Sequence, residues 1–326
     1  MTSKPRALVT APLRGPGFAK LRELADVVYD PWIEQTPLRI YSAEQLADRI
    51  TDEGAEIVVV ESDSVRDPVF ETGVRVIAST RGDPNNVDIA GATAAGIPVL
   101  NTPARNADAV AEMTVALLLA ATRHLLTADA DVRSGNIFRD GSIPYQRFRA
   151  AEIAGLTAGL VGLGAVGRAT RWRLSGLGLR VIAHDPYNPD ARHGLDELLA
   201  EADVVSMHAP VTDATAGMIG AREFAAMRDG VVFLNTARAQ LHDTDALVDA
   251  LTAGKVGAAG LDHFAGEWLP TDHALVGMPN VVLTPHIGGA TFDTEARQAQ
   301  MVADDLEALL AGNAPAHIVN PEVLGP

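Results

Sequence analysis

The chain of 326 residues is 47% hydrophobic, contains no cysteine and carries a formal net charge of −16 at pH 7. The acidic balance argues against a protein that binds nucleic-acid phosphates, and the missing cysteines exclude disulfides, thiolate zinc sites and a cysteine nucleophile. The most apolar stretch, residues 109–121, is too short to span a bilayer, and no signal-peptide core precedes the first strand, so a cytoplasmic protein without a membrane partner is expected.

The N-terminal part of the chain alternates short apolar runs with amphipathic segments. Ser42 and Gln45 form a capping box at the start of one such segment. Strands that alternate with helices predict a parallel sheet covered on both faces, and the total length predicts a second domain. The expected strands are residues 7–9, 27–29, 57–60, 74–78 and 98–100, and the expected helices are 18–24, 42–50 and 88–95.

Residues 106–124 form a predicted helix that is rich in alanine and leucine around nearly its whole circumference. Such a helix must be buried on all sides, which suits a place between domains or between subunits. Residues 133–149 contain Gly, Pro, Tyr and scattered Arg, and we expect an irregular connection without a core of its own.

The segment 157–186 contains the strongest motif of the chain. An apolar run leads into the sequence GLGAVG, an amphipathic segment follows, and a second apolar run ends at Asp185. This order of strand, glycine-rich turn, helix, strand and acid is typical of a dinucleotide-binding unit. Gly162 permits the tight turn, Gly164 lets a pyrophosphate approach the backbone, and Gly167 lets the helix pack close to the sheet.

Asp185 indicates which dinucleotide is bound. Its carboxylate can accept hydrogen bonds from the adenosine ribose hydroxyls but would repel a 2′-phosphate, and no arginine follows within the next few residues. The helix N-terminus behind the glycine turn offers N–H groups and the positive end of its dipole to the phosphates. The predicted cofactor is therefore NAD.

Beyond Asp185 the alternation of strands and helices continues. Ligands of open parallel sheets bind outside the carboxyl ends of the strands, which makes residues 208–210, 236–238, Asp262 and His286 candidate site residues. The last helix is expected to pack back on the first domain and make that domain discontinuous. The expected strands are 204–208, 231–235, 256–261 and 281–284, and the expected helices are 195–199, 223–227, 244–253 and 294–310.

Several blocks of the sequence together resemble those of the D-isomer-specific 2-hydroxyacid dehydrogenases. They read VGLGAVGR, HDPY, HAPVTDATAGMIG, NTARAQLHDTDAL, GLDHFAGE and PNVVLTPHIGGAT, and VDIAGATAAGIPVLNTPARNADAVAEMT precedes them. The resemblance implies an α/β fold with two doubly wound parallel-sheet domains. A Rossmann NAD domain at 104–294 would be inserted into a smaller, flavodoxin-like substrate domain at 1–103 and 295–326. It also implies a homodimer formed through the helix 106–124.

The resemblance further implies the chemistry, which is hydride transfer between NAD(H) and a D-2-hydroxy acid or its 2-oxo acid. Arg238 would bind the substrate carboxylate and 2-oxo group, His286 would be the general acid/base, and Glu267 would hold and charge-stabilise His286. The residue types suit these roles. Histidine exchanges protons near neutral pH, and arginine presents a planar, permanently charged fork to a carboxylate.

The remaining implied contacts involve the cofactor and the substrate. Arg81 and Gly82 would join Arg238 and His286 at the substrate. No metal is expected, because no carboxylate lies at ligand spacing from the scattered histidines, and His184, His208, His242 and His263 are not expected to be catalysts. Besides the glycine turn, the implied cofactor contacts are Ala165, Val166, Asp185, Pro210, Thr215, Thr236, Ala237, Asp262 and Gly288.

The chain departs from the family pattern where the substrate carboxylate would be held. The family has a Gly-x-Gly turn there, whereas this chain reads RGDPNN from Arg81, and Pro84 offers no N–H. Asp83 would disfavour an anion, while Arg81 is either a compensating group or an ordinary surface arginine. Ala239 and Trp268 replace the usual Gly and Pro. Glyoxylate, larger sugar acids and phosphorylated hydroxy acids are all open as substrates.

Two other functions fit the same residues. One is an NAD-sensing interaction protein, similar to the transcriptional corepressors of this family, which would need no hydride transfer. The other is a dehydrogenase of a donor without a C2 hydroxyl, such as formate or phosphite. Among single residues, Arg238 could instead pair with Asp243 or Asp245, and Asp262 could merely cap a turn.

Overall fold

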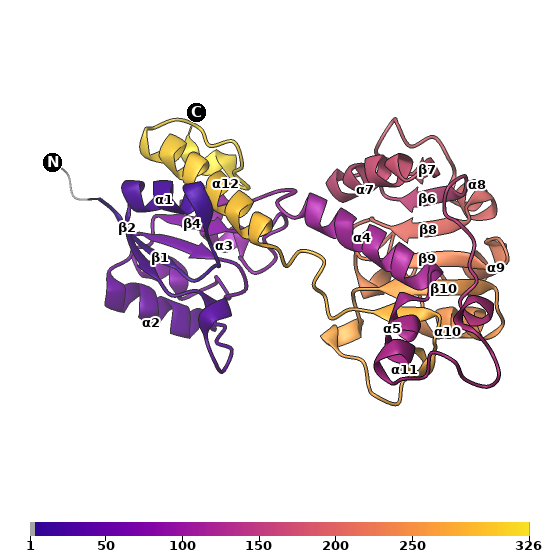
Figure 1. Ribbon diagram of the computed structural model, residues 1–326. Helices are drawn as coiled ribbons and strands as arrows, with labels where there is room; N and C mark the ends of the chain where they lie inside the picture. Colours follow the sequence, from indigo (N-terminus) through magenta and orange to yellow (C-terminus); the bar gives the residue numbers. More distant parts are fainter. Residues whose placement is uncertain (1–3, 326) are drawn as a thin grey trace. The chain divides into compact units, whose positions relative to one another are not determined.

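The computed structural model describes residues 4–325, so the outermost residues of the predicted substrate domain, 1–3 and 326, lie outside the described residues. The chain divides into two compact units (Figure 1). The first unit contains the chain up to Arg105 and the segment from Thr291 onward, and Asn106–Ala290 forms the second. These divisions fall a few residues from the predicted boundaries. Each unit contains one all-parallel sheet with helices, which confirms the predicted fold class.

The sheet of the first unit has the strand order β2-β1-β3-β4-β5, which is the flavodoxin-like order. All four residues of β3, with the sequence IVVV, are buried, as expected for a strand with helices on both faces. Its strands are β1 (Arg6–Val9), β2 (Asp26–Tyr29), β3 (Ile57–Val60), β4 (Val76–Ser79) and β5 (Val99–Leu100).

Two helices from opposite ends of the chain cover one face of this sheet. Leu21 of α1 and Val302 of α12 share one hydrophobic cluster, so the last helix packs beside α1 on this sheet (Figure 1). A Cβ on Gly17 would lie 2.2 Å from the backbone N of Gln300, so α1 and α12 touch through bare backbone. The other face is covered by α2 and α3. The helices are α1 (Gly15–Leu24), α2 (Ala43–Glu53), α3 (Ile89–Ala94) and α12 (Phe292–Leu310), and the short 3-10 helices are η1 (Trp32–Glu34), η2 (Val69–Glu71) and η5 (Pro321–Leu324).

The sheet of the second unit has the order β11-β10-β9-β8-β6-β7, and its direction of growth reverses between β6 and β8. In the commonest dinucleotide-binding order, 3-2-1-4-5-6, strands 1 and 2 correspond to β6 and β7, and strand 3 lies outside strand 2. In this sheet β7 is the edge strand, so the strand that would correspond to strand 3 is missing. Its strands are β6 (Thr157–Val161), β7 (Arg180–His184), β8 (Val204–Met207), β9 (Val231–Asn235), β10 (Val256–Leu261) and β11 (Val281–Leu283).

Helices cover both faces of this second sheet. Leu117 of α4 and Leu174 of α7 lie in the cluster on one face, and Leu198, Phe224 and Leu247 from α8, α9 and α10 lie on the other. The helices are α4 (Ala107–Thr122), α5 (Leu125–Arg133), α6 (Pro144–Arg147), α7 (Ala165–Gly176), α8 (Leu195–Glu201), α9 (Ala221–Ala226), α10 (Thr244–Thr252) and α11 (Ala274–Gly277), with the 3-10 helices η3 (Ala239–Leu241) and η4 (Ala265–Glu267).

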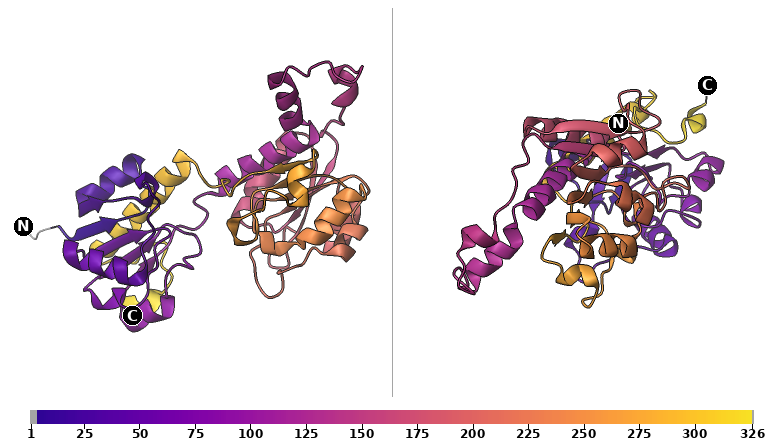
Figure 2. Two further views of the ribbon diagram at one scale, coloured as in Figure 1. Left: turned by 90° about the horizontal axis from the view of Figure 1, so that it is seen from below. Right: turned by 90° about the vertical axis from the view of Figure 1, so that its right-hand side faces the viewer.

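The predicted apolar helix is α4, and much of it is buried within its own unit, where it packs against α7, β9 and β10. Two helices follow α4. The helix α5 ends where the segment expected to be irregular begins, and the short α6 lies inside that segment. Figure 2 shows this purple stretch standing away from the sheet of its own unit. Within residues 4–325 no single helix is long and apolar enough to cross a membrane. The α4–α5 pair reaches that length and hydropathy only with a bend of 64° at its break.

Candidate active site

The predicted catalytic residues lie on loops that leave three neighbouring strands. Arg238 follows β9, Glu267 follows β10 and His286 follows β11, and these strands are adjacent in the sheet order. Because the strands are parallel, their carboxyl ends share one edge of the sheet, where ligands of such sheets bind. The topology therefore gathers residues that are widely separated in the sequence.

His286 and Glu267 form a hydrogen-bonded pair. The distance from His286 Nδ1 to Glu267 Oε1 is 2.9 Å, and the two side chains are 42% and 60% exposed. Both residues have left-handed backbones, with φ of 55° at His286 and 57° at Glu267. Such a φ is uncommon for a residue with a Cβ and costs on the order of 1 kcal/mol. The two loops thus hold the pair in place against local backbone preference.

Asp262 anchors the loop that carries His286. Its carboxylate is fully buried and accepts hydrogen bonds from Thr284 Oγ1 at 2.6 Å, from the Ile287 N–H at 3.0 Å and from the Gly288 N–H at 2.7 Å. A Cβ on Gly288 would lie 2.8 Å from Asp262 Oδ2, so only glycine permits this close approach. The predicted residues Asp262 and Gly288 are in direct contact, and the turn-capping role considered for Asp262 is present.

Asn235, which the sequence reading did not single out, supports the turn that carries Arg238. The Asn235 Nδ2 donates to the Arg238 carbonyl at 2.8 Å, and Asn235 Oδ1 accepts from the Ala237 N–H at 3.0 Å. Its Nδ2 also lies 3.0 Å from Nδ1 of the buried His242. A buried asparagine that ends an apolar strand just before the arginine was the signal that could have identified it.

His263 lies between the predicted catalytic residues, although it was not expected to take part. Arg238 Nη1 lies 3.3 Å from His263 Nε2, and the centroids of the His263 and His286 rings are 3.8 Å apart. His263 is 5% exposed. Burial, followed by the nearby His286 and Arg238, lowers the pKa of His263 to about 3. The imidazole is therefore neutral at physiological pH.

The glycine-rich turn has the shape that a pyrophosphate requires. Gly162 has a φ of 99°, and a Cβ there would lie 2.6 Å from the backbone N of Ala209, while a Cβ on Gly167 would lie 2.3 Å from the Gly162 carbonyl oxygen. Gly164 instead faces open space, and α7 begins directly after it without a side-chain cap. Uncapped N–H groups at a helix start beside a bare backbone fit a bound phosphate group.

Asp185 lies at the end of β7 beside this turn. Its Oδ2 accepts the Leu163 N–H at 2.8 Å and its Oδ1 accepts the Tyr187 N–H at 3.0 Å. Each carboxylate oxygen can accept a further hydrogen bond, so the half-buried Asp185 can accept bonds from both hydroxyls of a ribose. The residues at this edge fit NAD.

The other predicted cofactor contacts also follow carboxyl ends of strands in this sheet or begin α7. Thr215 Oγ1 donates to the Pro210 carbonyl at 2.6 Å, which brings these two residues together after β8. Thr236 is buried, and its hydroxyl lies 2.8 Å from that of Thr114 on α4. Ala165 and Val166 form the first turn of α7, and Ala237 precedes Arg238.

Arg81 and Gly82 lie in the first unit, in the loop after β4. Arg81 Nε donates to the Glu61 carbonyl at 2.6 Å and Nη1 donates to Asn85 Oδ1 at 2.9 Å. The Gly82 carbonyl accepts from Asn101 Nδ2 at 2.7 Å. The nearby Arg105 pairs with Glu61, so both arginines are engaged in shaping their own unit.

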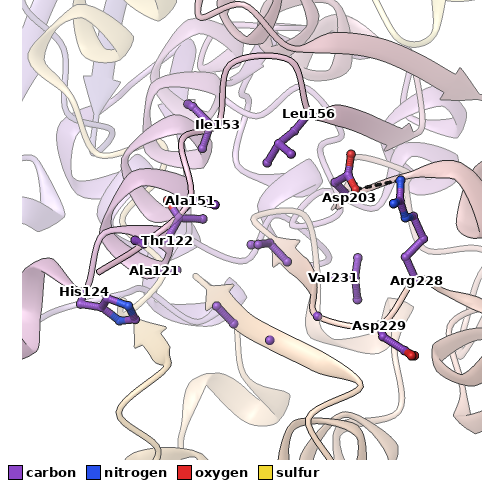
Figure 3. Close-up of a pocket in the computed structure, with 15 residues that line it drawn as sticks. Ala121, Thr122, His124, Ala151, Ile153, Leu156, Asp203, Arg228, Asp229 and Val231 are labelled. Atoms are coloured by element: carbon purple, nitrogen blue, oxygen red, sulfur yellow. Dashed lines mark ion pairs between the residues drawn. The ribbon is translucent and has the colours of Figure 1, made fainter. Parts of the chain in front are cut away.

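A cavity of about 330 Å³ lies at the opposite edge of the second sheet (Figure 3). Its lining includes Leu156, Asp203 and Val231, which lie at the amino ends of β6, β8 and β9, and Arg228 pairs with Asp203 at 3.0 Å. None of the predicted site residues lines it. Among residues 4–325 no group of three His, Asp or Glu side chains is arranged to hold a metal ion.

Comparison with known proteins relates this geometry to a family. Residues 115–288 match the model for the NAD-binding domain of D-isomer-specific 2-hydroxyacid dehydrogenases. A glyoxylate reductase of Thermofilum pendens is 36% identical over 333 residues, which span 99% of this chain and 96% of that protein.

Two solved structures are also similar over nearly the whole chain. The TT0316 protein of Thermus thermophilus has a TM-score of 0.82 and 36% identity, with 96% of this chain and 99% of that chain covered. A D-isomer-specific 2-hydroxyacid dehydrogenase of Lactobacillus delbrueckii ssp. bulgaricus, in its NAD-complexed form, has a TM-score of 0.79 and 28% identity, with 97% and 100% covered.

Proposed function

The chain belongs to the D-isomer-specific 2-hydroxyacid dehydrogenase family, and we propose that Arg238, Glu267 and His286 perform its reaction. It is an NAD-dependent oxidoreductase that interconverts a 2-hydroxy acid and the corresponding 2-oxo acid. A bound NAD would supply the hydride acceptor for oxidation at C2 of the hydroxy acid, and a bound NADH would supply the hydride donor for the reverse reaction. The hydrogen bond from His286 Nδ1 to Glu267 Oε1 at the carboxyl edge of the sheet is the observation that carries the assignment of roles.

His286 acts as the general acid/base through Nε2. Its Nδ1 is engaged with Glu267, so Nε2 is the nitrogen that is left to exchange a proton with the substrate. During oxidation Nε2 takes the hydroxyl proton as the hydride leaves C2, and during reduction the Nε2–H gives that proton to the carbonyl oxygen. The Glu267 carboxylate orients the ring and stabilises the imidazolium between these events.

Arg238 binds the carboxylate of the substrate. Its side chain is exposed, and a guanidinium can bind both carboxylate oxygens in parallel. The bonds from Asn235 to the Arg238 and Ala237 backbones support this role, because they fix the base of the side chain.

The proposed NAD-binding residues divide by the part of the cofactor they hold. Gly162, Gly164 and Gly167, with the first turn of α7, would hold the pyrophosphate, and Asp185 would hold the adenosine ribose. Pro210, Thr215, Thr236, Ala237, Asp262 and Gly288 would serve the nicotinamide half. The open space in front of Gly164 and the uncapped start of α7 support the pyrophosphate assignment.

For the substrate we propose a small, unphosphorylated 2-oxo acid of the size of glyoxylate. The name of the Thermofilum pendens relative supports this choice. Asp83 is exposed beside Arg81 and Gly82. The family resemblance implies that these two residues contact the substrate, in which case the negative charge of Asp83 would disfavour a second anionic group.

The test is NADH oxidation against glyoxylate, hydroxypyruvate and phosphohydroxypyruvate, with NADH binding measured separately. We expect turnover of the small acids, and we expect His286→Ala to abolish it while NADH still binds. Tight NADH binding without turnover of any acid would instead favour the NAD-sensing interaction protein. Oxidation of formate or phosphite with NAD would favour the dehydrogenase of a donor without a hydroxyl group.

We further propose that the enzyme is a homodimer. Because much of α4 is buried in its own unit, the contact surface is assigned to the stretch that follows α4, at residues 125–145. Seven large apolar side chains are exposed there, a density that is typical of an interface. They are Leu125, Leu126, Val132, Ile137, Phe138, Ile143 and Tyr145.

Sedimentation of the purified protein tests this assembly. We expect a dimer for the natural chain and a monomer for the double variant Phe138→Asp, Tyr145→Asp. A natural chain that sediments as a monomer at micromolar concentration would rule the dimer out.

The proposed location is the cytoplasm. The dependence on NAD(H), which the cell interior supplies, supports it, and a chain without cysteine is compatible with a reducing compartment. Cell fractionation against a cytoplasmic marker enzyme is the check, and enrichment in the membrane or secreted fraction would contradict it.

A further inference from the structure

His263 connects the two groups that would hold the two ends of the substrate. On one side its Nε2 lies 3.3 Å from Arg238 Nη1, and on the other its ring lies against the His286 ring, with centroids 3.8 Å apart and planes tilted by 48°. The far edge of His286 is held by Glu267 at 2.9 Å. Arg238, His263, His286 and Glu267 therefore form one continuous row of contacts.

The contact with Arg238 determines where the His263 proton lies. A guanidinium has only N–H donors, so the close nitrogen of the imidazole must accept. Nε2 is then unprotonated and the single proton lies on Nδ1, which is buried and has no hydrogen-bond partner among residues 4–325. A second proton would place a cation directly between Arg238 and His286, so the ring stays neutral in this position.

The contact with His286 restricts the acid/base ring from a second direction. Glu267 fixes one edge of His286 but leaves rotation about that hydrogen bond free. His263 is buried, so its ring forms a fixed surface against one face of the exposed His286. The two contacts together leave the His286 ring a single orientation, and proton transfer requires that orientation.

We propose that His263 is a positioning residue that sets the orientation of Arg238 and His286 relative to each other. The inference rests on the proposed roles of these two residues. It assigns two separable tasks to one side chain: the Nε2 atom orients the guanidinium that binds the carboxylate, and the ring face orients the imidazole that transfers the proton.

Two variants separate these tasks. His263→Phe keeps a flat ring against His286 but removes the ring acceptor, so Arg238 Nη1 keeps only its bond to the Ala237 carbonyl at 2.6 Å. The KM for the 2-oxo acid should then rise about tenfold, the loss expected for one hydrogen bond to a charged group, with kcat nearly unchanged. His263→Gln keeps an acceptor at similar reach but loses the ring, so kcat should fall about tenfold or more with KM nearly unchanged. Matched changes at His193, which contacts none of these residues, should alter neither constant.

The opposing outcomes are equally specific. The inference is overturned if the two His263 variants change KM and kcat in the same way. It is also overturned if neither variant differs from the natural enzyme. His286→Asn is measured in parallel: if that variant still turns over, the proposed function itself fails, whereas if it is inactive, the His263 variants test the positioning role alone.

A second measurement reads the position of the His263 proton in the natural protein, and variants serve only to assign the resonance. In ¹⁵N spectra of the imidazoles, the resonances that disappear in His263→Gln or His263→Asn belong to His263. We expect a neutral ring with its proton on Nδ1. A proton on Nε2 would remove the acceptor for Arg238 and overturn the inference.

Discussion

His286 and Glu267, the proposed acid/base pair, are held by two loops whose backbones are left-handed at these two residues. This conformation turns each side chain sharply away from the direction of the preceding strand, so that a residue after β10 meets one after β11. Local strain of this kind persists only where surrounding contacts impose it. For His286 those contacts are the three hydrogen bonds to the buried carboxylate of Asp262.

Replacing Asp262 by Asn should therefore destabilise the protein. In either orientation of the amide, the N–H of Ile287 or of Gly288 loses its acceptor, because only one oxygen remains. A buried donor without a partner costs about 1–3 kcal/mol. Urea unfolding checks this, with the exposed Asp272→Asn as the control that should change the free energy of unfolding by less than about 0.5 kcal/mol. Equal stabilities for the two variants would contradict the anchoring role.

Glu267→Gln separates charge from shape at the proposed acid/base pair. Glutamine can still accept the hydrogen bond from His286 Nδ1, but it cannot stabilise the imidazolium. We expect kcat to fall by roughly a hundredfold while NADH affinity is retained, as for the loss of an acid/base partner. Stopped-flow reduction of glyoxylate measures the step directly, and an unchanged rate would remove Glu267 from the mechanism.

At this scale the sequence could be read only in part. Arg238, Glu267 and His286 could be singled out because each belongs to a recognisable block after an apolar strand. The position of His263 could not be inferred, since its contacts depend on how three loops fold over one another. Asn235 was missed for a related reason, because a polar residue at a strand end indicates a turn but not which backbone groups it binds.

Among the elements, the longer helices that bury an apolar face were predictable, whereas α5, which exposes its apolar residues, and the four-residue helices α6 and α11 were missed. The capping box at Ser42 was apparent in the sequence and is present, and Val302 and Leu306 of α12 are buried on one side of that helix. α5 was missed because Leu125, Leu126 and Val132 face solvent, so no periodic pattern relates its apolar residues to a core. The proposed dimer contact would supply the second surface that such exposed apolar residues require.

The contact between α1 and α12 gives a prediction for one helical glycine. Gly17→Ala would place a Cβ 2.2 Å from the backbone N of Gln300, so the helices must separate, and we expect a loss of about 2–3 kcal/mol. Gly176→Ala, in α7, is the matched control because nothing lies within 4 Å of its Cβ position. That change should be neutral or stabilise by up to about 1 kcal/mol through helix propensity. Thermal unfolding of both variants tests the pair, and a harmless Gly17→Ala would mean that the helices are not so close.

For the whole molecule, the fold class followed from the alternation of strands and helices, because parallel strands need a covering helix between them. The strand order did not follow in the same way. The resemblance implied a Rossmann unit, whereas the chain after β7 runs through a turn directly to α8 and adds no strand outside β7. Short polar segments such as 186–194 carry too little pattern to distinguish an edge strand from a turn.

Buried neutral histidines make the stability of the second unit depend on pH. Burial lowers the pKa of His208 and of His242 to about 4 each, below the value of about 6.5 in an unfolded chain. The unfolded state therefore binds more protons, so this stability is fully present above about pH 6.5 and is lost as the pH falls toward about 4. In that pH window, each histidine lowers the free energy of unfolding by at most about 1.4 kcal/mol for each pH unit of acidification.

Urea unfolding at several pH values, with the slope compared between variants, tests this effect. His242→Asn should show a shallower loss of stability between about pH 6.5 and 4.5 than the natural chain. His193→Gln, at a half-buried histidine outside this buried pair, is measured alongside as the reference substitution. Identical slopes for all three proteins would show that carboxylates alone govern the acid response.

The discontinuity of the first unit has a consequence during synthesis on the ribosome. The cluster around β1 needs Ala299, Val302 and Leu306 of α12, which are translated only after the whole of the second unit. The nucleotide-binding unit is contiguous and can complete its core first, while α1 and its sheet wait with an uncovered apolar face. The first unit is thus exposed to chaperones and proteases until α12 emerges from the ribosome and covers that apolar face.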